Sequence, residues 1–98
     1  MYLNTIKTPK GKIIAVCDKE LIDKCLKQGK IILDIKSHAS FYKGKIVKEE
    51  EVINAIQSGD SLNLVGEKCI ALADKLGIIN KQNAKKIQGI PHIQVYKI

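Results

Sequence analysis

Two short stretches of this 98-residue chain place conformationally special residues beside polar side chains that can do chemistry. The first is Asn63-Leu64-Val65-Gly66-Glu67. If this stretch is helical, Asn63, Gly66 and Glu67 are spaced i, i+3 and i+4 and share one face. The free backbone donors of a helix start, which bind anions, would lie beside that face. The alternative is structural, because glycine also allows another segment to pack closely.

The second stretch is Gly89-Ile90-Pro91-His92-Ile93-Gln94. Gly89 accepts a positive φ, and Pro91 restrains the residue before it to an extended shape. On a final strand His92 and Gln94 point to the same side, because side chains alternate along a strand. A histidine serves as a general base or a hydrogen-bond donor near neutral pH. Equally, His92 can be a structural residue that bonds to a buried carbonyl.

The two stretches form a single site only if the fold brings them together. We assign no catalytic residue from the sequence. The hypothetical binding residues are Asn63, Gly66, Glu67, Pro91, His92 and Gln94.

The remaining reactive side chains indicate no metal or cofactor site. Cys17, Cys25 and Cys69 have no CxxC spacing, which favours free thiols in a reducing cytosol. Cys17 precedes an expected helix start, so it is the thiol whose pKa we expect to be lowered. The two histidines have no ligand spacing, and the chain contains no glycine-rich phosphate-binding motif.

All 17 basic residues are lysines, and the net charge is +7. Lysine attracts polyanions but lacks the planar fork with which arginine reads guanine or clamps phosphate. Lysines beside aromatic residues nevertheless predict a nucleic-acid patch that holds phosphates and stacks a base. The patch comprises Lys7, Lys10, Lys12, Tyr42, Lys43 and Lys45. The alternative is a solvated surface whose lysine content reflects the genome or a hot habitat.

Length and composition predict a single domain over residues 1–98 with one modest aliphatic core. No apolar run reaches the roughly 20 residues that cross a membrane, and the N-terminus, polar after Leu3, does not have the pattern expected of a secretory signal peptide. We therefore expect a soluble, cytoplasmic protein. Its ends are basic, whereas residues 49–80 carry an excess of acids.

Periodicity and turn residues predict the order β-β-α-β-β-α-α-α-β, an α/β (α+β) fold. The expected form is a two-layer sandwich with a mixed sheet of about five strands and three to four helices. The predicted strands are 2–8, 12–17, 30–35, 41–47 and 92–98. The predicted helices are 19–28, one that starts at Glu49 and stops at Gly59, one between Asp60 or Ser61 and Gly77, and 81–87 capped by Asn80.

Four motifs resemble those of a family of small archaeal proteins catalogued as domain of unknown function 424. They are Thr8-Pro9-Lys10-Gly11, Ala15–Leu21, Ser61–Glu67 and Gly89–Gln94. The resemblance implies an archaeal housekeeping protein associated with translation, and it supplies no catalytic residues. The chain departs from the family in a longer loop at Lys36–Ser40 and in using lysine where relatives use arginine.

The sequence leaves three functional hypotheses. The first is a non-enzymatic module that binds RNA or a ribonucleoprotein and is linked to translation. The alternative is a small enzyme or anionic-ligand-binding protein with a pocket between the helix start at 61–67 and segment 89–94. A third is a structural subunit whose acidic middle meets a basic partner.

Overall fold

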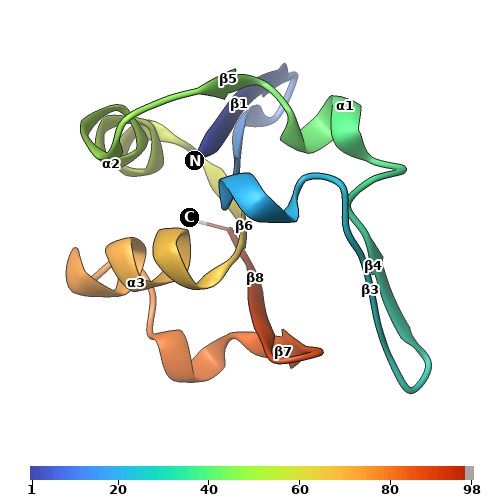
Figure 1. Cartoon of the computed structure of the whole chain (residues 1–98). Helices are drawn as coiled ribbons and strands as arrows, with labels where there is room; N and C mark the ends of the chain where they lie inside the picture. Colours follow the sequence, from blue (N-terminus) through green and yellow to red (C-terminus); the bar gives the residue numbers. More distant parts are fainter. Residues whose placement is uncertain (97–98) are drawn as a thin grey trace.

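A six-stranded mixed sheet forms the centre of the computed structural model, which describes residues 1–96 (Figure 1). Its order is β5-β1-β2-β6-β8-β7; β2 and β6 run parallel, and the other neighbours are antiparallel. Its strands are β1 Tyr2–Thr8, β2 Gly11–Cys17, β5 Lys45–Ile46, β6 Ser61–Val65, β7 Lys85–Ile87 and β8 Ile90–Tyr96. The predicted α/β class with a mixed sheet is confirmed, with six strands in place of about five.

Helices α2 (Glu49–Ser58) and α3 (Glu67–Lys75) cover one face of this sheet (Figure 1). Three glutamates in the first turn of α2 suit the positive end of the helix dipole. Val52 and Ile56 lie one turn apart on α2, and both are buried against the sheet. Gly59 follows the helix, as predicted. Within residues 1–96, no helix combines the length and apolar character needed to span a membrane.

The opposite face carries a 3-10 turn η1 (Lys19–Leu21), a short helix α1 (Ala39–Tyr42) and a separate hairpin (Figure 1). The hairpin pairs β3 (Cys25–Gln28) with β4 (Ile31–Asp34), which confirms the strand predicted over 30–35. The predicted helix over 19–28 is wrong, because Leu26 pairs across the hairpin with Leu33. The predicted strand over 41–47 is also wrong except for β5, since its first residues belong to α1.

Residues 61–65 form a strand, so the predicted helix start at Asp60 or Ser61 is wrong. Leu62 and Leu64 face α2 and α3, whereas Asn63 and Val65 face the other side. Gly66 then adopts φ +116° and ψ 153°, a backbone conformation essentially restricted to glycine, and α3 begins at the next residue. The predicted end of this helix at Gly77 is confirmed, because Leu76 is its C-cap.

The C-terminal region is a hairpin rather than a helix followed by a strand. Asn80 accepts from the Gln82 N–H at 3.0 Å, as a cap should, but the turn η2 (Lys81–Asn83) is only 3-10. The predicted helix over 81–87 is wrong beyond that turn, because β7 pairs with β8 through a two-residue turn at Gln88 and Gly89, both with positive φ. The predicted strand over 92–98 is β8, and residues 97–98 lie outside the described part of the chain.

Candidate functional site

The two stretches singled out in the sequence are in direct contact. They lie on the neighbouring antiparallel strands β6 and β8, where Asn63 is paired with Gln94. Just beyond β6, the Gly66 N–H donates to the Pro91 carbonyl at 2.9 Å. Because the first stretch is a strand followed by a helix, its polar residues do not share one helix face. They divide between the two faces of the sheet.

On the face that carries α1, three side chains form a hydrogen-bonded cluster. Asn63 Oδ1 accepts from the Tyr42 hydroxyl at 3.2 Å and lies 3.1 Å from His92 Nε2. Because the amide oxygen is an acceptor, the imidazole carries its proton on Nε2 and keeps a lone pair on Nδ1. Asn63 and Tyr42 are only 8% and 4% exposed. The cluster therefore joins α1 to β6 and β8 inside the fold.

The His92 ring of this cluster is neutral at pH 7. Partial burial lowers the pKa of His92 below its ordinary value of 6.5, because desolvation disfavours the imidazolium. A neutral ring that donates to Asn63 is suited to fixing the amide and to accepting a proton at Nδ1. It does not supply a positive charge to an anionic ligand.

A buried carboxylate that the sequence predicted to cap a helix over 19–28 makes no side-chain bond there and instead caps the start of α3. Asp18 follows β2, is 1% exposed, and accepts from the Lys68 N–H at 2.8 Å and the Cys69 N–H at 3.0 Å. A Cβ on Gly66 would overlap this carboxylate, so the glycine permits its approach. The helix donors expected to receive an anionic ligand are thus already used by the protein itself.

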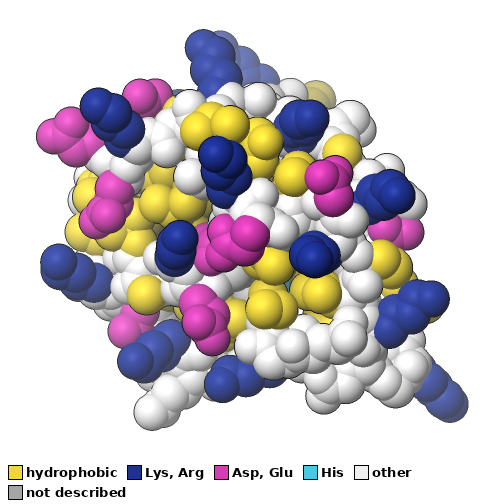
Figure 2. Space-filling model, in the orientation of Figure 1, with side chains coloured by type: hydrophobic (Ala, Val, Ile, Leu, Met, Phe, Trp, Pro, Cys, Tyr) yellow, Lys and Arg dark blue, Asp and Glu magenta, His cyan; other side chains and the backbone are white. Residues whose placement is uncertain are grey.

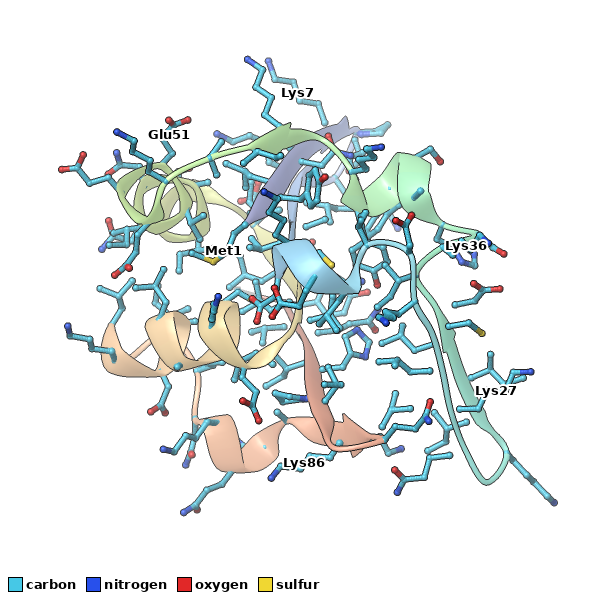
Figure 3. The ribbon with its side chains drawn as sticks, in the orientation of Figure 1. Met1, Lys7, Lys27, Lys36, Glu51 and Lys86 are labelled. Atoms are coloured by element: carbon cyan, nitrogen blue, oxygen red, sulfur yellow. The ribbon has the colours of Figure 1, made fainter. Side chains whose placement is uncertain are left out.

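Glu67 and Pro91 lie on the opposite side of the sheet from the Asn63 cluster, in a groove between α3 and the segment 81–91. The groove encloses about 480 Å³. Its remaining lining residues are Ile70, Ala71, Lys81, Gln82, Ala84 and Lys86. Lys86 projects from β7 on this side of the molecule (Figure 3). Two lysines and one glutamate thus surround a mostly apolar floor.

The predicted lysine patch is split by the fold. Tyr42 is buried and bonded to Asn63, so the prediction that it stacks a base is wrong. Lys45 pairs with Leu3 at one end of β1, whereas Lys7 lies near the other end and points outward (Figure 3). Leu3 and Lys7 are four residues apart on this strand, which at about 3.4 Å per residue separates them by roughly 14 Å. Lysines are spread around the face seen in Figure 2, so charge alone does not locate a site.

An exposed aromatic residue that belongs to neither of the two sequence stretches lies near two other lysines, Lys10 and Lys12. Tyr96 is 78% exposed and lines a pocket of about 420 Å³ at the turn between β1 and β2. The pocket is also lined by Thr8, Lys10, Gly11, Lys12, Ile13, Asp60 and Ser61. The strand register places Ile13, Ser61 and Tyr96 in one row across β2, β6 and β8. The alternation of side chains along each strand could have indicated this row, but only if the pairing of the three strands were already known.

The cysteines have no reactive arrangement. Burial, with the nearby charges of Asp18 and Glu20, raises the pKa of Cys17 from 9.0 to about 12, so the expected lowering is wrong. Burial also raises the pKa of Cys69. Among residues 1–96, no three His, Cys, Asp or Glu side chains gather closely enough to hold a metal ion.

Comparisons with known proteins agree with the fold. The chain is similar to the crystal structure of an uncharacterised conserved protein from Methanopyrus kandleri, with a TM-score of 0.78 and 25% sequence identity. The alignment covers 97% of this chain and 89% of that one. A search of curated proteins gave no match. Residues 6–98 match the family described as protein of unknown function (DUF424), and the chain therefore belongs to that family.

Proposed function

We propose that the protein is a non-enzymatic module that binds RNA or a ribonucleoprotein through the pocket beside Tyr96. The observation that carries this proposal is the exposed tyrosine itself, because its ring lines the same pocket as Lys10 and Lys12. An exposed aromatic ring stacks an unpaired base, and neighbouring ammonium groups hold the phosphate backbone.

From the position of the pocket, an RNA strand bound there would lie across the sheet. Lys7 and Lys10 are exposed at the β1–β2 turn, and Ile13 adds an apolar wall in the same row as the tyrosine, with Ser61 between them. Lys43 and Lys45 are also exposed, at the far end of β1. There they are available to phosphates further along the same RNA strand. The lysine contacts are point charges, so affinity should depend on salt more than on sequence.

The family resemblance adds a setting to this proposal. A translation-associated archaeal protein with a basic, aromatic pocket would meet its RNA in a ribonucleoprotein such as the ribosome.

The test is fluorescence anisotropy with a labelled single-stranded RNA, measured from 50 to 300 mM salt. We expect log affinity to fall linearly with log salt. Tyr96→Ala should weaken binding, whereas Tyr96→Phe keeps the ring and should retain it. Lys10→Ala should lower the salt slope by roughly 0.7 relative to Lys86→Ala, the matched control on β7. Binding that is absent, or equal in wild type and Tyr96→Ala, would refute the proposal.

A second candidate function rests on the groove between α3 and segment 81–91. Its volume of about 480 Å³ suits a small ligand, and Glu67, Lys81 and Lys86 provide polar contacts. The sequence allowed a small enzyme or anionic-ligand-binding protein with a pocket between residues 61–67 and 89–94; of the six residues named for that pocket, Glu67 and Pro91 line this groove. Asp18 counts against an anion held by the helix start, because it already accepts from the N–H groups of Lys68 and Cys69. Saturable binding of inorganic phosphate lost in Lys81→Ala would favour this candidate over RNA binding.

A further inference from the structure

We propose that the pocket beside Tyr96 discriminates among unpaired bases, and that Asp60 accepts a hydrogen bond from an exocyclic amino group of the base. Cytosine and adenine are then preferred to uracil. This inference rests on the proposed binding of single-stranded RNA and names the part of that RNA which the pocket selects.

Asp60 is held in place by two reciprocal bonds to one residue. Its N–H donates to the Lys12 carbonyl at 2.9 Å, and the Lys12 N–H donates to Asp60 Oδ2 at 2.7 Å. A carboxylate offers about four lone-pair positions, so the bond from the Lys12 N–H leaves the Asp60 carboxylate able to accept further hydrogen bonds. The side chain thus presents a fixed acceptor to the pocket without first having to be ordered.

Gly11 makes this position of Asp60 possible. It adopts φ +127°, and a Cβ at this residue would lie 2.7 Å from Asp60 Cγ. Any side chain at residue 11 would therefore push the carboxylate away from the β1–β2 turn. The close approach of Asp60 is a built feature of the turn and not a chance rotamer on an open surface.

The Thr8 hydroxyl of the pocket is already engaged within the β1–β2 turn. The Thr8 hydroxyl donates to the Gly11 carbonyl at 2.8 Å and accepts from the Lys10 N–H at 3.2 Å. The pocket of about 420 Å³ has the size of a small-molecule site and takes a single nucleoside. With the base against the Tyr96 ring, Asp60 is the charged acceptor on the pocket wall.

The chemistry of the bases then gives the direction of the preference. Cytosine N4 and adenine N6 carry amino groups that donate to a carboxylate. Uracil presents a carbonyl oxygen at the corresponding position, which a carboxylate repels. Lys10 also lines the pocket, and its positive charge offsets that of Asp60, so the acid does not exclude RNA.

The experiment compares single-stranded oligo(C), oligo(A) and oligo(U) of equal length as competitors for the full chain. We expect oligo(C) and oligo(A) to bind about threefold to tenfold more tightly than oligo(U), the net effect of one hydrogen bond in a pocket that is open to water. Asp60→Asn should bring this ratio toward one, because an amide both donates and accepts. Asp23→Asn is the matched control, since it makes the same charge change at an exposed acid outside the pocket.

The outcomes separate the two proposals. Equal affinity of the wild type for all three oligonucleotides, or a ratio that survives in Asp60→Asn, overturns the base preference and leaves RNA binding standing. Failure of every oligonucleotide to bind overturns RNA binding and the preference together. The comparison in wild type needs no variant, so a folding defect in Asp60→Asn does not decide the result.

Discussion

Replacing Asp18 tests the claim that the start of α3 is capped by the protein and is not open to a ligand. The carboxylate is 1% exposed and accepts from two backbone N–H groups on a helix 50 residues away in sequence. Asp18→Ala removes both acceptors and leaves the two donors without them. Asp18→Asn keeps the shape but offers one acceptor oxygen and one amide group that opposes the second donor.

The magnitude follows from these contacts. Loss of a cap costs about 1–2 kcal/mol, and a hydrogen bond to a charged group contributes about 1.5–3 kcal/mol. Because the two bonds share one carboxylate, we expect Asp18→Ala to lower the free energy of unfolding by about 3 kcal/mol. Asp18→Asn should lower it by about half as much. For a chain of this size, each kcal/mol lowers Tm by about 4–8 °C.

Urea unfolding followed by circular dichroism measures these differences at neutral pH. Asp23→Ala is the control, because it removes an exposed acid from the same segment and should change stability by no more than about 0.5 kcal/mol. If both Asp18 variants matched this control, the carboxylate would not be the cap, and the helix donors would be available to an anion.

Three further predictions follow from other parts of the structure. Gly66→Ala should lower the free energy of unfolding by about 3 kcal/mol or more in the same assay, since alanine is strained at φ +116° and overlaps the cap carboxylate. Burial lowers the pKa of His92, so as pH falls the unfolded chain binds a proton on this histidine before the folded chain does. The contribution of His92 to stability should therefore be full above pH 6.5 and be lost as pH drops through the folded pKa. In urea unfolding, the midpoint of His92→Gln should fall less than that of the wild type over the same pH range. One thiol, the exposed Cys25, should react quickly with a thiol reagent at pH 8, whereas the buried Cys17 and Cys69 should react only after urea is added; rapid reaction of all three would contradict their burial.

Elements with strong local signals were predictable from the sequence. The turn at 8–11 between two apolar strands is present, with Thr8 paired to Gly11. The helix that starts at Glu49 and stops at Gly59 is also present. In both, the residues that start and stop the element lie inside or next to it, so no knowledge of distant partners is needed.

The stretch from 61 to 66 was mispredicted because its apolar spacing fits two periods. Leu62, Val65 and Cys69 continue the stripe of α3 at helical spacing, yet Leu62 and Leu64 also alternate as a strand does. Pairing with β2, whose residues lie 48 positions earlier, decides for the strand. Gly66 ends it, and that positive φ is stabilised only in the folded chain.

Candidate site residues show the same limit. The contact between residues near Asn63 and His92 was predictable as a hypothesis, and the fold makes it. The role of Asp18 was not, because its donors come from a helix brought near by the parallel pairing of β2 with β6. The place of Tyr96 in a pocket was not predictable either, because it depends on the register that pairs Tyr96 with Ser61. The local sequence pattern identifies unusual residues, whereas the pairing of distant strands determines which residues lie next to them.

The most direct test of the central claim is to map where RNA binds. Backbone amide shifts of the ¹⁵N-labelled chain would be followed by NMR during titration with a short single-stranded RNA at low salt. We predict that the largest changes fall on residues 10–13, on Asp60 and Ser61, and on Tyr96. Changes centred instead on Glu67, or no saturable change at any residue, would contradict the pocket beside Tyr96 as the binding site.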